Sequence, residues 1–329
     1  MGEGLRRAEC GMSAIPTVFM FSGQGSQYFQ MGRELFEKNA LFRSWMVRLD
    51  DLAQQLSGAS VVDALYSNER GKAEPFDRTL LTHPAIFMVE YCLAQVLIHH
   101  GLRPDFVLGA SLGAFAAAAV AGFLEVEMAL EGVIRQAIAL EERSERGGMI
   151  AILHDPALYS EEFLREQSEL AGVNFCTHFV VSARSRELEE IEAVLRRRSI
   201  DYQRLPVSLP FHSRWIDNAK VPFESFMRSI GCRPGRVPLV CCEQTAALTD
   251  LADGYFWTVV RRPIRFREAA AGLEQWGACR YIDVGPAGTL ATFLKYTMSP
   301  SSRSVICAIL TPYGLDQRNL AATLAAVND

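Results

Sequence analysis

The sequence of 329 residues carries no basic excess, since 33 Lys and Arg residues stand against 38 Asp and Glu residues, for a formal net charge of −5. Proteins dedicated to nucleic acids usually carry a basic surplus, so this balance argues against a nucleic-acid partner. Metal-binding patterns are also missing. None of the eight cysteines forms a Cys-x-x-Cys pair, and none stands at zinc-type spacing from one of the six histidines. We therefore expect no metal site.

Long apolar segments are missing as well. No apolar run reaches the ~18 to 20 residues that a membrane helix needs, and no basic start precedes an apolar secretory segment. We therefore expect a cytoplasmic protein with reduced cysteines and no membrane partner. Hydrophobic residues nonetheless make up 49% of the chain, which is enough for a sizeable core and argues against disorder.

The order of apolar segments predicts an α/β fold in two parts. Strand and helix patterns alternate over residues 15–146 and again over 208–329, which indicates one large subdomain with a mostly parallel sheet. Between them, residues 147–207 follow the order βαββαβ, which is typical of a small ferredoxin-like subdomain inserted into the larger one. Residues 1–14 are polar and aperiodic, and we predict an unstructured leader there.

Individual elements follow from the periodicity of the apolar residues. The large part has predicted strands at Thr17–Phe21, Phe106–Leu108, Val237–Cys242 and Arg280–Val284, with helices at Ala85–His99, 114–121 and 126–142. The insert has predicted strands at Met149–Leu153, within Val173–Ala183 and at Tyr202–Val207, with helices at Leu158–Ala171 and Arg186–Arg198.

The strongest chemical signal is Gly109-x-Ser111-x-Gly113, which follows an apolar strand and precedes an Ala-rich helix. This is the context of a nucleophile elbow, where a serine on a strained turn needs neighbours that do not crowd it. The helix that follows aims backbone N–H groups at developing negative charge. We therefore predict that Ser111 is a nucleophile.

A serine nucleophile needs a base, and six histidines are available. His99 and His100 stand at a helix end, and His154 and His178 fall in the insert, so these four are interpreted as structural or surface residues. The remaining two are His83 and His212. His212 follows the insert, at a junction where a cleft is expected, and spacing alone favours it only narrowly over His83.

Five separated motifs occur in a shared order: Phe21-Ser-Gly-Gln-Gly-Ser-Gln27, Gly109-Ala-Ser-Leu-Gly113, Pro210-Phe-His-Ser213, Arg262-Pro-Ile-Arg-Phe266 and Asp283-Val-Gly-Pro286. Over about residues 16–310 the chain resembles the malonyl-CoA:acyl-carrier-protein transacylase family, which includes the acyltransferase domains of polyketide and fatty-acid synthases. The resemblance implies a hydrolase-like α/β core with a ferredoxin-like insert.

The resemblance also implies roles for individual positions. Ser111 matches the family nucleophile and His212 its general base. The family orients this imidazole with a backbone carbonyl, and the matching position is Val259. The oxyanion hole would be formed by the backbone N–H groups of Leu112 and Gln24. No cofactor is implied, because the substrate is itself an acyl thioester of phosphopantetheine or CoA.

The sequence departs from the family pattern where a carboxylated substrate would bind. The family Arg that pairs with a malonyl carboxylate is replaced by Gln136. Its neighbour Arg135 is rotated by about 100° along a helix and cannot readily take over. Ala110 and Phe211 flank the two catalytic residues and, with His83, are further candidates for substrate selectivity.

This departure resembles the stand-alone acyl hydrolases that accompany trans-acyltransferase polyketide synthases. We predict an acyl hydrolase that removes acetyl and longer non-carboxylated groups from acyl carrier protein, working as a monomer with polyketide synthase modules. The alternatives are an acyltransferase that moves acetyl, other monoacyl or malonyl units from CoA to the carrier, and a catalytically weak carrier-docking module. An acidic carrier would favour a basic face, either Arg196–Arg198 or the arginines at positions 261, 262, 265 and 267.

Overall fold

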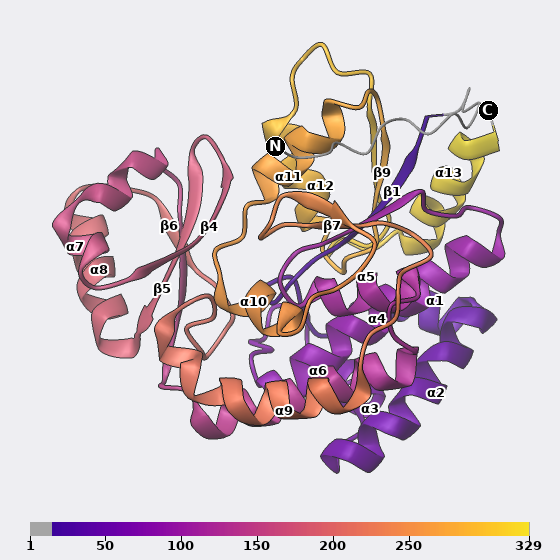
Figure 1. Ribbon diagram of the computed structural model, residues 1–329, viewed down its shortest axis with the longest axis horizontal. Helices are drawn as coiled ribbons and strands as arrows, with labels where there is room; N and C mark the ends of the chain where they lie inside the picture. Colours follow the sequence, from indigo (N-terminus) through magenta and orange to yellow (C-terminus); the bar gives the residue numbers. More distant parts are fainter. Residues whose placement is uncertain (1–14, 329) are drawn as a thin grey trace.

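The computed structural model describes residues 15–328, so the leader predicted at 1–14 lies outside the described residues. Two sheets organise the chain (Figure 1). The large sheet has the strand order β10-β9-β1-β2-β7-β8. Its strands are β1 (Thr17–Phe21), β2 (Phe106–Gly109), β7 (Leu239–Cys241), β8 (Ala246–Leu248), β9 (Arg280–Asp283) and β10 (Val305–Ala308). All neighbouring strands are parallel except β7 and β8, so the predicted mostly parallel sheet is confirmed.

Strand β1 shows how the sheet is buried on both faces. Its side chains alternate between the faces, as the pleat of a strand requires. Phe19 and Phe21 join the core under the N-terminal helices, whereas Val18 and Met20 pack with Phe266 and other residues of the opposite layer. The large subdomain is therefore a sheet between two layers of helices.

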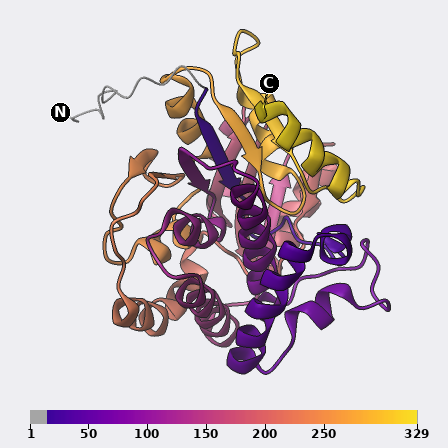
Figure 2. The same cartoon turned by 90° about the vertical axis from the view of Figure 1, so that its right-hand side faces the viewer.

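The helices of the first half gather on one side of the large sheet, as Figures 1 and 2 show in indigo and purple. They are α1 (Arg33–Lys38), α2 (Ala40–Ser57), α3 (Val61–Tyr66), α4 (Thr79–His99), α5 (Gly113–Ala121) and α6 (Val126–Arg143). The second half adds η2 (Arg214–Ala219), α9 (Lys220–Ile230), α10 (Tyr255–Arg261), α11 (Phe266–Glu274), α12 (Thr289–Thr297) and α13 (Asp316–Asn328).

Helix α4 is longer than its sequence pattern predicts. It begins at Thr79, so Pro84 lies inside the helix and not in its first turn. Its 21 residues are long and apolar enough to cross a membrane, contrary to the expectation that no such segment exists, but 83% of its most apolar window is buried within the protein. Burial on all sides identifies α4 as the central helix of the core.

The four-stranded sheet has the order β4-β5-β3-β6 with antiparallel neighbours, which is the predicted ferredoxin-like arrangement. Its elements are β3 (Gly147–Ile152), η1 (Pro156–Ser160), α7 (Glu162–Arg165), β4 (Glu169–Phe175), β5 (His178–Arg184), α8 (Ser185–Arg197) and β6 (Tyr202–Arg204). All of them come from one continuous stretch of chain.

The long helix predicted at Leu158–Ala171 is wrong. A 3-10 turn and the short α7 take its place, and strand β4 already begins at Glu169. The hydroxyl of Ser168 donates to the carbonyl of Leu164, and the hydroxyl of Tyr159 donates to the Ser168 carbonyl. The Tyr159 hydroxyl thus occupies the Ser168 carbonyl, which a continuing helix would use as an acceptor, and the chain turns into the sheet.

The two subdomains are joined by backbone as well as by side chains. The Ile264 N–H donates to the Ala171 carbonyl at 2.8 Å, and Gly172 forms a parallel bridge with Ile264. A Cβ on Gly172 would lie 3.0 Å from the Ile264 carbonyl oxygen, so glycine permits this approach. Strand β4 therefore borders the segment that follows α10.

Candidate active site

Ser111 lies on a tight turn between β2 and α5, with φ at +54°. The two glycines of the motif allow this turn. A Cβ on Gly113 would lie 2.2 Å from the Phe21 carbonyl oxygen, and one on Gly109 would lie 2.5 Å from the Ala114 Cα. The strained backbone presents the Ser111 hydroxyl above the end of the sheet, as the elbow motif predicts.

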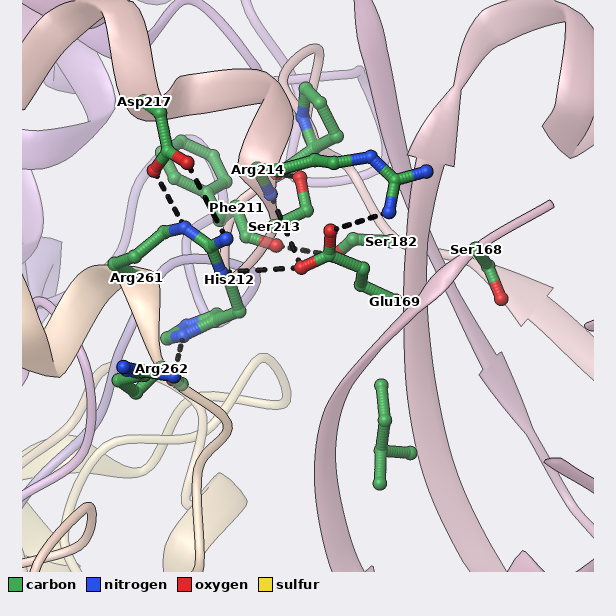
Figure 3. Close-up of polar contacts among 12 residues, drawn as sticks. Ser168, Glu169, Ser182, Phe211, His212, Ser213, Arg214, Asp217, Arg261 and Arg262 are labelled. Carbon is green, nitrogen blue, oxygen red and sulfur yellow. Dashed lines mark hydrogen bonds and ion pairs between the residues drawn. The ribbon is translucent and has the colours of Figure 1, made fainter. Parts of the chain in front are cut away.

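His212 is brought onto that hydroxyl from a distant part of the chain. Its Nε2 lies 2.9 Å from the Ser111 Oγ. Its Nδ1 lies 2.7 Å from the carbonyl oxygen of Arg262, a contact that Figure 3 shows. A carbonyl can only accept, so the proton sits on Nδ1 and leaves Nε2 free to take one. Between the two candidate histidines, the geometry selects His212.

The carbonyl that orients His212 belongs to Arg262, so the assignment of Val259 is wrong. Val259 lies inside α10, whereas Arg262 follows the last helical residue and takes an extended conformation with ψ at 156°. Leaving the helix turns the Arg262 carbonyl outward. A second carbonyl of this segment, that of Val260, accepts the backbone N–H of His212 at 3.0 Å.

The surroundings of His212 favour its neutral form. Burial lowers its pKa from 6.5 to about 4, the bond to the Arg262 carbonyl opposes this shift, and the nearby Arg261 cation adds to it. At neutral pH the imidazole therefore carries no charge. An uncharged imidazole beside a serine hydroxyl is the state that a general base requires.

The loop after β1 lies directly against the elbow. A Cβ on Gly23 would lie 2.9 Å from the Ala110 carbonyl oxygen and 3.1 Å from the Ser111 Cβ. Within the described residues, the backbone N–H groups of Gln24 and Leu112 donate to no other protein group. Two unpaired backbone donors beside a nucleophile are the elements of an oxyanion hole.

This loop is anchored to α4 at two points. The Gln24 side chain donates to the Thr82 hydroxyl at 2.7 Å. One oxygen of Glu90 accepts both the Ser22 backbone N–H at 2.6 Å and the Ser22 hydroxyl at 2.9 Å. Glu90 is fully buried, and burial raises its pKa well above the usual value. A buried carboxyl group thus fixes the residue that begins the loop.

Ser111 and His212 open into a cleft of about 340 Å³ between the two subdomains. Residues of the insert form one wall, including Met149, Val180 and His178. The predicted site residues that line the cleft are Gln24, Ala110, Ser111, Phe211 and His212. The structure thus gathers five separately predicted residues around one cavity.

Gln136 and His83 do not line this cleft, and both are buried. Neither side-chain atom of Gln136 and neither ring nitrogen of His83 has a hydrogen-bond partner among the described residues. The His83 ring lies 5.5 Å from that of Phe211, which does line the cleft. Arg135 is exposed and pairs with Glu131, so it faces away from Gln136 as expected.

Some residues of the site were missed at the level of the sequence. Asn174 and His178 line the cleft and lie 3.0 Å apart between Nδ2 and Nδ1. No local pattern marks them, because the pairing of β4 with β5 brings them to the cleft. Glu90 could have been found, since it is the single charged residue within the apolar segment Ala85–Ile98.

An α/β core with a serine on a nucleophile elbow and a histidine on its hydroxyl defines the class of serine-dependent acyl-transfer enzymes. Residues 18–328 match the family model described as the acyl transferase domain. The chain belongs to this family, as its motifs predict.

Two similar proteins are both described as polyketide biosynthesis acyltransferase homologues. BaeD of Bacillus velezensis is 47% identical and PksD of Bacillus subtilis 42% identical, each over 93% of this chain and 94% of the relative. Among solved structures, a loading acyltransferase of the avermectin modular polyketide synthase superimposes with a TM-score of 0.86 at 25% identity, covering 95% of this chain and all of the other.

Proposed function

We propose that the protein is an acyl hydrolase of polyketide biosynthesis that removes acetyl and longer non-carboxylated acyl groups from acyl carrier protein thioesters. The observation that carries the proposal is the uncharged character of the acyl site. No Lys or Arg is among the described residues that line the cleft, and the buried position 136 holds a neutral amide. The chain's similarity to two polyketide biosynthesis acyltransferase homologues supports the pathway.

Acylation uses the Ser111–His212 pair. The Ser111 Oγ attacks the thioester carbonyl while the His212 Nε2 takes its proton. The N–H groups of Gln24 and Leu112 stabilise the tetrahedral oxyanion. Collapse breaks the carbon–sulfur bond, and His212 returns the proton to the departing carrier thiol. The acyl group is then held as a Ser111 ester.

Deacylation repeats these steps with water as the nucleophile. His212 takes a proton from water as the oxygen attacks the ester carbonyl, and it then protonates the Ser111 oxygen that leaves. The free acid and the regenerated hydroxyl are the products. The same carbonyl of Arg262 holds the imidazole in the required tautomer throughout.

Selectivity follows from charge. A malonyl carboxylate would enter a cleft in which no described lining residue is a Lys or Arg that could neutralise it, and an unpaired buried charge costs several kcal/mol. An acetyl or longer alkyl group carries no such penalty. Phe211, Ala110 and the aliphatic wall residue Met149 offer apolar contact to it.

The second candidate function is transfer of an acyl unit, acetyl, monoacyl or malonyl, from CoA to the carrier. The family membership and the similarity to a loading acyltransferase favour it. Both candidates share the acyl-enzyme and differ in the final acceptor, water or a second carrier thiol.

The carrier partner is acidic in this proposal, and the basic residues near the cleft suggest where it docks. Arg262, Arg265 and Arg267 are exposed and form no ion pair with any described side chain. The residues between them, Ile264 and Phe266, line the cleft.

Of the two faces considered from the sequence, this one is the more available, because Arg196 and Arg198 already pair with Glu192 and Glu161. We place this reaction in the cytoplasm.

The test uses acetyl-loaded and malonyl-loaded carrier protein, each with and without unloaded holo-carrier. Mass spectrometry of the carriers follows where the acyl group goes, with Ser111→Ala as the inactive control. The proposal expects acetyl release to water that is little affected by the added carrier. Faster transfer to the carrier than to water would overturn hydrolysis, and preferred turnover of malonyl would overturn the argument from charge.

A further inference from the structure

Two carbonyl groups of one short segment hold the proposed base. The Val260 carbonyl accepts the backbone N–H of His212 at 3.0 Å, and the Arg262 carbonyl accepts its Nδ1–H at 2.7 Å. The residue between them is Arg261, the last residue of α10. Any change in the position of Arg261 therefore moves both acceptors of His212 together.

The Arg261 side chain is fixed by two carboxylates from different parts of the chain (Figure 3). Its Nε donates to the Asp217 Oδ1 at 2.6 Å, and its Nη1 donates to the Glu169 Oε2 at 3.2 Å. The Arg261 and Glu169 side chains are only 21% and 22% exposed. Partial burial makes the Arg261–Glu169 pair stronger than an ordinary surface pair, whereas the Asp217 side chain is 49% exposed.

Glu169 connects this pair to the loop that carries His212. Its carboxylate also accepts the Arg214 backbone N–H at 3.2 Å and the Arg214 Nη1 at 3.0 Å. Strand β4 of the insert is thus bound both to α10 and to the residues just after His212. Asp217 adds η2 as a third element.

We propose that Arg261 is a positioning residue for His212. Its ion pairs with Asp217 and Glu169 fix the segment whose flanking carbonyls set the orientation and tautomer of the imidazole. The proposal rests on the proposed role of His212 as the base for Ser111. It assigns the insert a part in catalysis, because Glu169 on β4 supplies one of the two anchors.

The rate of serine activation depends on the position of the base. A base must reach the serine hydroxyl within hydrogen-bond distance, and misplacement by about 1 Å can reduce the rate about 100-fold. Arg261 also bears a charge near the imidazole, and Glu169, Asp217 and Arg214 are the other charged groups in this network. Removing the Arg261 cation leaves the two carboxylates to favour the imidazolium form.

The experiment measures the activation of Ser111 without any acyl acceptor. A fluorophosphonate probe reacts with the serine, and its second-order labelling rate is followed against pH for wild type, Arg261→Met and Arg261→Lys. The matched control is Arg186→Met, which removes a surface pair with Glu190. We expect labelling to fall about tenfold or more in Arg261→Met, with partial recovery in Arg261→Lys and an acid limb shifted to higher pH.

Wild-type labelling and an unchanged acid limb in a folded Arg261→Met variant would overturn the proposal. If that variant does not fold, Glu169→Gln and Asp217→Asn decide, since each keeps the arginine and removes one anchor. Both should label severalfold more slowly than wild type, and wild-type behaviour of both would equally overturn it. Failure of the hydrolase proposal is distinguishable, because it would alter the acyl acceptor and leave these labelling rates unchanged.

Discussion

Ser111 and His212 are both held at positive φ, +54° and +59°, while their side chains hydrogen bond at 2.9 Å. Left-handed backbone is costly for residues other than glycine, at about 1 to 3 kcal/mol each. Two such residues in one contact indicate that the surrounding structure enforces the geometry. Gly109 and Gly113 do so at the serine, and the carbonyls of Val260 and Arg262 do so at the histidine.

The first prediction concerns the pH dependence of acylation. His212 acts when neutral, and burial lowers its pKa to about 4. The acylation rate should therefore be nearly constant from about pH 5 to about pH 8 and fall with acid only near pH 4. Stopped-flow measurement of thiol release from acetyl-loaded carrier gives the profile. A midpoint near the usual histidine value of 6.5 would contradict this prediction.

The second prediction concerns Gln136, which is fully buried with an unpartnered amide. Gln136→Arg should accept malonyl better, because it adds a cation for the substrate carboxylate that the described residues lining the cleft do not supply. Without malonyl the buried cation is unpaired, so the free energy of unfolding should fall by a few kcal/mol.

Gln136→Met and Arg135→Gln are the controls for this experiment. Met keeps the volume and removes an amide that has no partner, so stability should change little. Arg135 is exposed and pairs with Glu131, so its loss should leave selectivity unchanged. Competition between acetyl-loaded and malonyl-loaded carrier measures selectivity. Unchanged selectivity in Gln136→Arg would show that residues other than Gln136 determine which acyl group is accepted.

The third prediction concerns stability in acid. Burial lowers the pKa of His83 to about 3 in the folded protein, whereas the unfolded histidine titrates near 6.5. The stabilising contribution of neutral His83 is complete above pH 6.5 and is lost as pH falls toward 3. As pH falls from 6.5 toward 3, the free energy of unfolding of the wild type should therefore drop relative to that of His83→Gln. The drop should reach up to about 1.4 kcal/mol for each pH unit.

Urea unfolding at neutral and acid pH measures this difference. Burial raises the pKa of Asp283 to about 6, so this residue changes the free energy of unfolding with pH in the opposite direction. Asp283 is present in both proteins, so its effect cancels in the difference between them. The exposed His154 provides the control, and His154→Gln should follow the wild-type curve. If the free energy of unfolding changed equally with pH in the wild type and in His83→Gln, His83 would not be held neutral by burial.

The fourth prediction concerns Glu90, which accepts two hydrogen bonds from Ser22. Glu90→Leu leaves a buried N–H without a partner, so it should cost about 1 to 3 kcal/mol of stability and lower the acylation rate. Glu90→Gln keeps the acceptor oxygen and should retain more of both. Thermal unfolding and carrier deacylation measure the two variants. Equal losses in both would show that the acceptor oxygen at position 90 is not what holds Ser22.

The fifth prediction concerns the loop against the elbow. Gly23→Ala would bring a Cβ within 2.9 Å of the Ala110 carbonyl oxygen, so the loop must shift away from Ser111. We expect at least a tenfold loss of kcat, because one oxyanion donor moves with the loop. Gly272→Ala is the control, since its Cβ would meet nothing within 4 Å and it lies in helix α11. Full activity of Gly23→Ala would show that this loop does not contribute to the oxyanion hole.

Local patterns were sufficient where one element determines the outcome. The continuous apolar run of β1 and the glycines around Ser111 act within a few residues, and the structure confirms both the strand and the turn. The helix predicted over residues 158–171 is wrong because its apolar spacing suits a helix, whereas in the structure the Tyr159 hydroxyl occupies the Ser168 carbonyl and β4 begins at Glu169.

The details of the site depend on long-range geometry. The orienting carbonyl was assigned to Val259 and belongs to Arg262, because the point at which α10 ends decides which carbonyl turns outward. A sequence pattern does not fix the residue at which a helix ends more closely than about one or two residues. Gln136 is unusual in the sequence, but its complete burial outside the cleft lining depends on the packing of α6.

The backbone bonds between Ile264 and strand β4 bear on protein engineering. Because Ile264 also lines the cleft, a chimera that exchanges only residues 147–207 would break a shared strand edge within the acyl site. A transplanted insert should therefore carry a matching segment around residue 264. Residues 147–207 and the segment around residue 264 should therefore be exchanged together when the acyl preference of this fold is to be altered.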